Sequence, residues 1–585
     1  MRTVLARRMI GIIVWGGIVF IPSALAGQSG QKIFNIRDFG ATGTKAGSAQ
    51  AAIQKAVKGR AFGSPLARGL YPRASTAEVD PRAKPGAPAA VDACAAAGGG
   101  QVYVPPGQYA TGTIHLRSHV RFFVEAGATI YSIKNKAAFD KDALFYGEDL
   151  TQISLEGRGT IDGQGGYVYR PKGDFHDDFI YPNQVEMEKL GKPLVRSFPK
   201  EDQFGKLVLL LRCRDVRISG LNFIDSPSWT MHLYGCERTV IDGVFIRSSL
   251  KDGVWADGID PDGCRDLRIS NCTIETGDDA LVFYSMNWFG PALPCENITV
   301  TNCRLSSASS AIKFCDGNMN AVRNVTIDNC VITKANRGIS FMNFDGGVVE
   351  NVVLSNLTID CVRYAWFWWG DGEPFHFNIK KRSEVHKNWK KEDDRPAGRI
   401  RNVKITNVIA RGQGASVCNG HPDSWLEGIT MDNVTLFIAH DPAAPYDKAV
   451  HALTFKWARN LKLRNVEIVW DGLEYAKWES ALCLDEVQGL ELDGFVGRQA
   501  ATEKAKTAPA VLFHQVEGAL VRNCRAALGT DEFFRFSGRR TNDIVLSGND
   551  FRPARSAVKI EPEVGPSTVR ELNNIPPRAK HVHRP

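Results

Sequence analysis

A short phrase of alternating apolar and polar residues returns along most of the chain. Its form is apolar-x-apolar-x-Asn/Gly-x-x-apolar, as in "LRISNCTI" from Leu267, "VTIDNCVI" from Val325 and "LKLRNVEI" from Leu461. Alternation with a period of two predicts a short β-strand with one buried face. The Asn or Gly that follows predicts a tight turn with a left-handed backbone conformation.

The spacing of this phrase predicts the fold class. Its central apolar residues recur at Ile269, Val300, Ile327 and Leu354, which are steps of 31, 27 and 27 residues. Repeats of this length predict a solenoid. The connections are polar and Gly-rich, which favours stacked parallel strands over a leucine-rich repeat with its helices. We therefore predict an all-β fold, a single-stranded right-handed parallel β-helix with a short N-terminal cap and no separate catalytic domain.

The N-terminal segment predicts export. A positively charged start, an apolar run from Met9 to about Ile21 and the small-x-small pattern at Ala24-Leu25-Ala26 are typical of a signal peptide. A membrane anchor is the alternative, although the run is short for a spanning helix. We expect a secreted or periplasmic protein that does not stay inserted in a membrane after signal removal. The predicted organisation is a signal peptide at 1–26, a cap with the first coils at 31–134 that contains an irregular insertion at about 58–90, a β-helix catalytic domain at 135–570 and a tail at 571–585.

Cysteine content and charge narrow the function classes. The 13 cysteines are scattered without a CxxC pair, which disfavours a zinc site. Cys272, Cys303 and Cys330 share one position of the repeated phrase, so we expect inward-facing stacked thiols in preference to disulfides. The net charge of +8 is spread along the chain. For an exported protein it indicates an acidic polysaccharide as partner in preference to nucleic acid.

The candidate chemistry lies in the segment "ADGIDPDGCRDLRISNCTIETGDDA". Asp257 precedes a glycine, and Asp278 and Asp279 directly follow Gly277. Asp257 and Asp278 are 21 residues apart, which is about one short coil. Because successive coils lie about 4.8 Å apart, these carboxylates are expected on one face. Carboxylates this close raise at least one pKa, which general acid catalysis requires. A calcium site or a solvated acidic loop is the alternative.

The same segment, with "FNIRDFGATG" and the repeats, resembles glycoside hydrolase family 28, the polygalacturonases and rhamnogalacturonan hydrolases. The resemblance runs from about Lys32 to beyond Leu436. It implies hydrolysis of a pectic substrate with inversion, by a monomer that needs no cofactor or metal. Asp278 would be the general acid, and Asp257 and Asp279 would hold and deprotonate the attacking water. Inverting carboxyl groups lie roughly 6.5–9.5 Å apart.

The sequence departs from the family pattern at three motifs. The Asn-Thr-Asp motif falls on Trp255-Ala256-Asp257 and keeps only the Asp; the Gly-His-Gly motif falls on Ser309-Ser310-Ala311; the Arg-Ile-Lys motif falls on Gly338-Ile339-Ser340. The family's His, Arg and Lys are therefore absent. Lys313 and Arg337 lie close in sequence and are expected to grip a substrate carboxylate instead. These changes favour a rhamnogalacturonan-type substrate or cleavage from a chain end (exo action).

A Trp-rich insertion, "YAWFWWGDGEPFHF" from Tyr364, interrupts the repeat between Leu354 and Ile405. Trp368, Trp369 and Glu373 are expected to bind substrate, by stacking against a sugar ring or by closing the groove into a pocket that accepts a chain end. Packing of the aromatic residues against the solenoid is the alternative.

Two other function classes fit parts of the sequence. A β-helix polysaccharide lyase acts on pectin but uses calcium and a basic residue. A non-catalytic glycan-binding β-helix would explain the lost cations, although all three carboxylates remain. The Gly-Asp-Asp phrase favours the hydrolase.

Overall fold

The structure is a computed structural model that describes residues 32–45, 49–53, 90–167, 170–171, 197–198, 205–364, 370–385, 389–440, 450–472, 474–565 and 567–578. The predicted signal peptide, the insertion at 58–90 apart from Ala90, and the side chains of Trp368 and Trp369 lie outside these residues. In the part of the chain that is described, no helix is long and apolar enough to cross a membrane.

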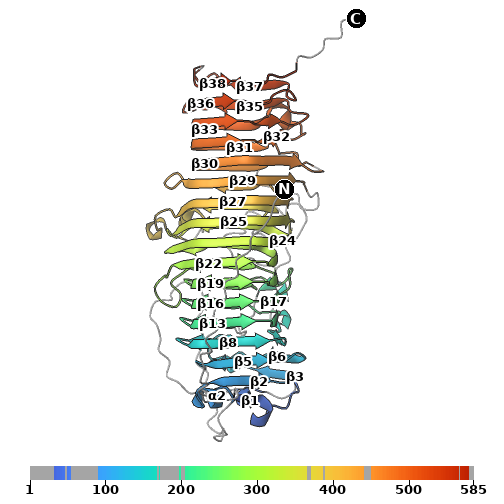
Figure 1. Cartoon of the computed structure of the whole chain (residues 1–585), viewed down its shortest axis with the longest axis vertical. Helices are drawn as coiled ribbons and strands as arrows, with labels where there is room; N and C mark the ends of the chain where they lie inside the picture. The colour runs from blue at the N-terminus through green and yellow to red at the C-terminus, as the bar shows by residue number, and fades with distance from the viewer. Residues whose placement is uncertain are drawn as a thin grey trace, which may run out of the picture.

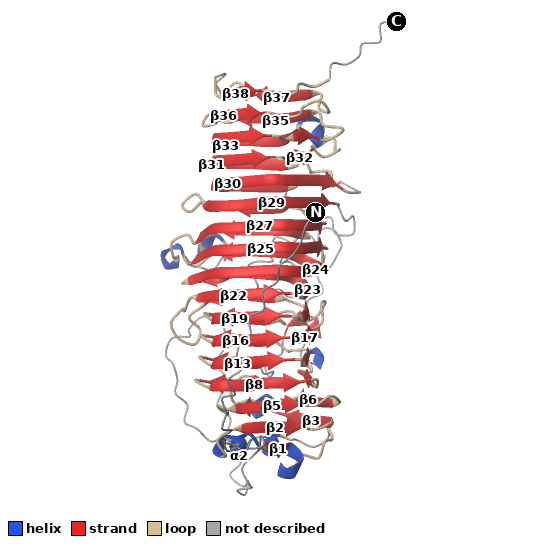
Figure 2. Ribbon diagram, viewed as in Figure 1, coloured by secondary structure: helices blue, strands red, loops and turns tan. Residues whose placement is uncertain are grey.

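The chain winds into a single right-handed parallel β-helix, as predicted (Figure 1). Strands lie across the long axis of the molecule and stack coil upon coil from the N-terminal to the C-terminal end, and helices are few and short (Figure 2). Each coil contributes strands to three parallel sheets, and several long strands in the second half bend from one sheet into the next.

The first sheet begins at β1 and ends at β38. Its strands are β1 (Ile33–Asn35), β2 (Gly100–Val104), β5 (Val120–Val124), β8 (Thr151–Gly157), β13 (Arg214–Ser219), β16 (Glu237–Asp242), β19 (Arg265–Ser270), β22 (Cys295–Thr301), β24 (Ala321–Asn343), β25 (Val348–Cys361), β27 (Arg399–Gly412), β29 (Leu426–Ile438), β30 (Leu453–Trp470), β31 (Leu482–Asp493), β33 (Pro509–Arg522), β36 (Asn542–Ser547) and β38 (Val569–Leu572).

The second and third sheets complete each coil. The second contains β3 (Gly107–Thr111), β6 (Ala128–Ser132), β9 (Thr160–Asp162), β14 (Asn222–Ile224), β17 (Phe245–Arg247), β20 (Thr273–Thr276), β23 (Arg304–Asn318), β32 (Val496–Gly497) and β34 (Arg525–Ala526), with parts of the long strands. The third contains β4 (Ile114–His115), β7 (Ala143–Glu148), β12 (Lys206–Leu211), β15 (Met231–Tyr234), β18 (Ile259–Asp262), β21 (Leu281–Ser285), β26 (Glu373–Ile379), β28 (Ser416–Asn419), β35 (Glu532–Ser537) and β37 (Ser556–Ile560), again with parts of the long strands.

The helices are α1 (Gln50–Ile53) and α2 (Ala90–Ala96), with 3-10 turns η1 (Ile36–Phe39), η2 (Lys136–Ala138), η3 (Gly165–Tyr167), η4 (Arg382–Glu384), η5 (Lys391–Asp393) and η6 (Lys504–Thr507). A small antiparallel pair, β10 (Arg170–Pro171) and β11 (Ser197–Phe198), lies apart from the three sheets. Helix α2 buries Val91 and Cys94 and contacts β1, β2 and β5, so it covers the N-terminal end of the core. At the other end β38 extends to Leu572, beyond the predicted boundary at 570.

The asparagine of the repeated phrase makes the turn that the sequence predicts. Asn271, Asn302 and Asn329 have φ values of 56°, 56° and 53°. Their side chains also join the coils, because Asn329 Nδ2 donates to Asn302 Oδ1 at 2.7 Å and Asn302 Nδ2 donates to Asn271 Oδ1 at 3.3 Å. Each coil is thereby fixed in register with the next at its surface.

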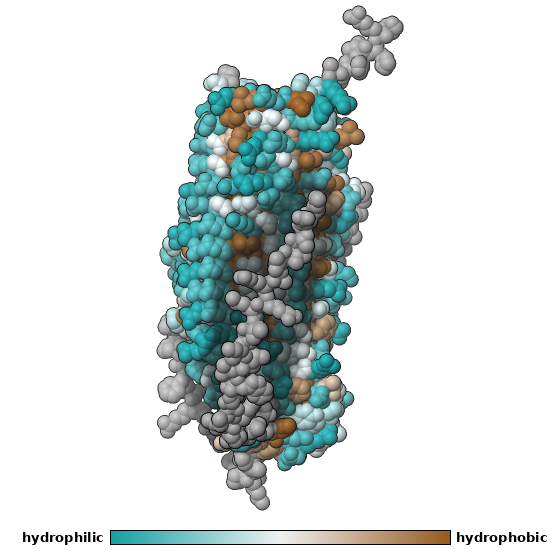
Figure 3. Space-filling view, viewed as in Figure 1, coloured by the Kyte–Doolittle hydropathy of each residue, from teal (hydrophilic) through white to brown (hydrophobic). Residues whose placement is uncertain are grey.

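The core is built from inward-facing side chains that repeat from coil to coil. Cys272, Cys303 and Cys330 are buried free thiols, as predicted. Aromatic rings stack in the same way, with centroids 4.3 Å apart between Phe314 and Phe341. The face shown in Figure 3 is mostly hydrophilic, with scattered hydrophobic residues.

Candidate active site

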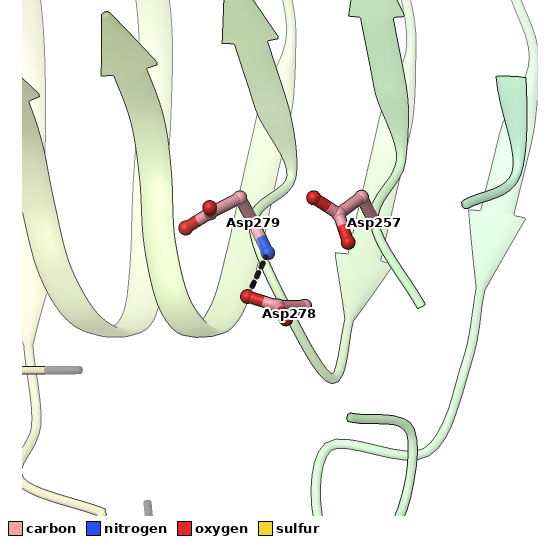
Figure 4. A group of neighbouring side chains, drawn as sticks. All are labelled: Asp257, Asp278 and Asp279. Atoms are coloured by element: carbon pink, nitrogen blue, oxygen red, sulfur yellow. Dashed lines mark hydrogen bonds between the residues drawn. The ribbon is translucent and has the colours of Figure 1, made fainter. Parts of the chain in front are cut away.

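Three buried aspartates lie where two neighbouring coils enter the third sheet. Asp257 comes two residues before Ile259 of β18, and Asp279 comes two residues before Leu281 of β21. Ile259 pairs with Leu281, so Asp257 and Asp279 lie side by side, and Asp278 lies on the turn below them (Figure 4).

Burial and proximity set the character of this group. Asp257, Asp278 and Asp279 are only 3%, 6% and 2% exposed, and each offers an oxygen within 4.8 Å of the others. The prediction that they share one face is confirmed. The spacing of roughly 6.5–9.5 Å expected between inverting carboxyl groups stays a prediction, because the 4.8 Å limit applies to one oxygen of each residue.

A glycine shapes the turn that carries Asp278. A Cβ on Gly277 would lie 2.3 Å from Ser249 O and 2.4 Å from Gly253 O. No other residue fits without moving this backbone, so the Gly-Asp-Asp order follows from close packing between coils.

Asp279 is held by three donors from the next coil. Its Oδ1 accepts hydrogen bonds from Ser309 Oγ at 2.7 Å and from the Ser310 backbone N–H at 2.8 Å, and its Oδ2 accepts from Lys313 Nζ at 2.9 Å. The two serines stand where the family pattern has Gly-His. This donor set suits an ionised carboxylate, which only accepts hydrogen bonds.

Two backbone donors orient Asp278. Its Oδ2 accepts from the Trp255 N–H at 3.1 Å and its Oδ1 accepts from the Asp279 N–H at 3.0 Å. The carboxyl group is thus fixed at the turn beside Asp257.

Asp257 is the least satisfied member of the group. Its Oδ1 is buried and has no hydrogen-bond partner. Burial raises the pKa of Asp257 well above its ordinary value, and the neighbouring carboxylates, Asp278 first, raise it further, while Lys313 opposes them. A buried, unpartnered oxygen in an acidic group is costly unless a ligand or water uses it.

Asp260, which the sequence reasoning missed, extends this acidic strip. It lies on β18 opposite His232 of β15, is fully buried, and neither carboxylate oxygen has a hydrogen-bond partner. Burial raises its pKa well above the ordinary value, and Asp279 and Asp278 add to the shift. The alternation along β18 could have revealed it, since Ile259 faces inward and the next residue faces outward.

The predicted substrate-binding residues that the structure describes lie in two different places. Lys313 lies at the acidic group, where it bonds Asp279 and approaches Asp316 at 3.6 Å. Arg337 and Glu373 are instead paired with each other through Arg337 Nε and Glu373 Oε1 at 2.7 Å, and both are buried. We expected Arg337 to bind a substrate carboxylate, but its guanidinium already bonds the carboxylate of Glu373.

Glu373 of the Arg337–Glu373 pair has two further polar contacts. Glu373 Oε2 accepts from the Asp371 N–H at 2.5 Å, and His376 Nδ1 lies 3.2 Å from Glu373 Oε1. Burial alone would raise the pKa of Glu373. The Arg337 guanidinium and then His376 outweigh burial and hold that pKa well below its ordinary value.

Comparisons with known proteins agree on one family. Residues 94–367 match the model of glycosyl hydrolases family 28. A probable polygalacturonase of Vitis vinifera is 29% identical over 238 residues, which cover 37% of this chain and 43% of that protein. An endo-polygalacturonase of Pectobacterium carotovorum is 24% identical over 190 residues, which cover 29% of this chain and 43% of that protein. The chain thus matches less than half the length of these curated relatives.

Solved structures share the fold. A hyperthermoactive exopolygalacturonase from Thermotoga maritima aligns with a TM-score of 0.54 at 21% identity, covering 75% of this chain and 92% of that one. A family 28 exopolygalacturonase from Yersinia enterocolitica aligns with a TM-score of 0.55 at 15% identity, covering 79% of each chain.

Proposed function

Because this chain belongs to glycosyl hydrolase family 28, we propose that it hydrolyses a glycosidic bond in a pectic, galacturonate-containing oligosaccharide or polysaccharide. One observation carries the proposal: three buried carboxyl groups converge within reach of one another, and the Lys313 ammonium bonds one of them, Asp279. Such a group holds a proton at one carboxyl and negative charge at another, which is the state that acid–base hydrolysis needs.

In the proposed mechanism Asp278 donates its proton to the glycosidic oxygen as the bond to the anomeric carbon breaks. Asp257 and Asp279 orient a water, and Asp257 takes a proton from it as its oxygen attacks that carbon. The raised pKa of Asp257 supports this role, because a base is most effective when its pKa lies near the working pH. Lys313 and the two serines keep Asp279 as the fixed negative charge.

We further propose inversion at the anomeric carbon, by resemblance to the family. The spacing rule separates the two outcomes by the distance between the carboxyl groups, about 5–5.5 Å for retention and roughly 6.5–9.5 Å for inversion. Proton NMR of the product formed in the first minutes decides the matter. Inversion gives the anomer opposite to that of the cleaved bond, whereas retention would make one aspartate a nucleophile.

We propose cleavage from a chain end, a mode supported by the two exopolygalacturonases that share the fold. Viscosity and reducing ends are followed together on polygalacturonate and rhamnogalacturonan. Chain-end cleavage releases reducing ends while viscosity falls slowly; a rapid fall at low conversion would mean mid-chain cleavage. Export through the signal peptide at 1–26, action outside the cytoplasm and a monomeric state belong to the same proposal.

The same assay separates the hydrolase from its alternatives. Hydrolysis gives saturated products and persists in chelator. Products that absorb as unsaturated uronates, with activity restored by calcium, would identify a lyase and assign the acidic group to a cation. Binding of the oligosaccharide without turnover would identify a glycan-binding protein.

A further inference from the structure

Trp255 has an unfavourable backbone conformation next to the proposed general acid. Its φ is +71°, in the left-handed region, and its backbone N–H donates to Asp278 Oδ2 at 3.1 Å. Left-handed backbone is rare for bulky residues and is favoured by Gly and Asn. Asparagines such as Asn271 and Asn302 occupy it throughout this solenoid.

The side chain of Trp255 is not explained by the backbone role. Any residue except proline could supply the N–H that orients Asp278, and Asn would hold the same φ with less strain. The indole does not fill the core either, because 36% of Trp255 is exposed. A strained residue that keeps a large exposed side chain at an acidic site points to use by a ligand.

We propose that the indole of Trp255 is a stacking platform for the pyranose ring next to the scissile bond, and so determines substrate specificity. The inference rests on the proposed function. Its backbone nitrogen lies 3.1 Å from an Asp278 oxygen, so the indole is within one side chain's length of the proposed general acid. A flat, rigid aromatic surface buries the apolar C–H face of a sugar at low entropic cost.

The test compares Trp255→Asn with Trp255→Phe and with a matched control. Trp457 is also a tryptophan at positive φ, 52°, and it lies on β30, five strand pairings along the third sheet from β21. That is about 24 Å at 4.8 Å per coil. Trp457→Asn therefore makes the same chemical and backbone change away from the acidic group.

Two readouts are taken on each variant. The first is the melting temperature. The second is calorimetric binding of trigalacturonate in an Asp278→Asn background, together with KM and kcat for the same trimer in the wild-type background. We expect Trp255→Asn to leave the melting temperature unchanged or to raise it, and to weaken binding and raise KM about tenfold, which corresponds to about 1.4 kcal/mol. Trp255→Phe keeps most of the affinity, and Trp457→Asn keeps all of it.

Unchanged affinity in Trp255→Asn would overturn the stacking role. A lower melting temperature in Trp255→Asn, with equal affinity loss in the Asn and Phe variants, would also overturn it and leave a structural role. Failure of the proposed function gives a different pattern, in which wild-type protein binds the trimer without releasing products while the affinity differences among variants persist. Absence of binding in the parent protein would overturn both proposals.

Discussion

Two buried charged clusters follow one another along the third sheet and differ in charge balance. In the first, Asp257, Asp278 and Asp279 converge, with Lys313 as the cation at bonding distance. In the second, one carboxylate, Glu373, is matched by the Arg337 guanidinium, with exposures of 2% and 8%. Both come from the same position of the coil, since Ser310, which bonds Asp279, pairs with Arg337, and Arg337 pairs with Glu373.

The contrast separates structural charge from reactive charge. A buried ion pair whose partners satisfy each other stays in one protonation state, because the attraction between the partners and their hydrogen bonds offset the cost of desolvating both charges. A buried group with surplus negative charge raises pKa values and leaves acceptors such as Asp257 Oδ1 unpartnered. Unlike the balanced pair, the acidic group therefore suits the proton transfer that the proposed mechanism requires.

Asp278→Asn gives the largest expected effect, because an amide cannot donate the proton that the leaving oxygen requires. We expect turnover on pectic oligosaccharides to fall by about a thousandfold or more. The amide oxygen still accepts from one of the two backbone N–H groups that bond Asp278, and reduced repulsion among the carboxyl groups offsets the loss of the other acceptor, so the melting temperature should not fall. Near-normal turnover in this variant would contradict the assignment of the general acid.

Arg337→Met acts on the balanced cluster and should change stability rather than chemistry. It leaves Glu373 buried without its cation, which costs about 3–5 kcal/mol of unfolding free energy. Thermal unfolding measures the loss, and the double variant Arg337→Met, Glu373→Gln should recover most of it. If Arg337→Met were instead stable but had a higher KM, Arg337 would bind substrate after all.

Lys313→Met tests charge balance within the acidic group, because Lys313 is the cation that bonds Asp279. Loss of a charged hydrogen bond of about 1.5–3 kcal/mol predicts a fall in kcat of about tenfold to a hundredfold. Lys313 lowers the pKa of Asp257, so its removal raises that pKa and moves the acid limb of the pH–rate profile to higher pH. Lys456→Met, which breaks the Lys456–Asp485 pair at 2.6 Å on a later coil, is the control and should leave the profile unchanged.

The fold could be predicted because its information is local and repeated. Each phrase encodes one strand and one left-handed turn, and Asn271, Asn302 and Asn329 make that turn at nearly equal φ. The three aspartates followed from the same regularity, since one coil of separation places Asp257 beside Asp279.

What the sequence could not give depends on register across irregular segments. Arg337 and Glu373 are 36 residues apart and flank the Trp-rich insertion, so their pairing becomes visible only once β24 is aligned with β26. The alternation along β18 indicates that Asp260 faces outward, but a strand pattern does not show that it is buried or that its oxygens lack partners.

The smallest expected effect is on stability, and its sign is the informative part. The pKa of folded Asp257 is raised, so the folded protein binds this proton more tightly than the unfolded chain, where the pKa is about 3.9. Stability therefore falls as pH rises from about 4 through the raised pKa, and Asp257→Asn removes this loss. We expect the variant to match the wild type near pH 3 and to exceed it at neutral pH by on the order of 1.4 kcal/mol for each unit by which the pKa is raised.

Melting temperatures from pH 3 to 8 measure this difference. Asp550→Asn is a control of opposite sign, because hydrogen bonds from Arg552 lower the pKa of Asp550 to about 2. That aspartate stabilises the fold above its unfolded pKa, so its amide variant should be slightly less stable at neutral pH. An Asp257→Asn protein that gained no stability at neutral pH would mean that Asp257 carries no raised pKa, and the acidic group would then be as balanced as the Arg337–Glu373 pair.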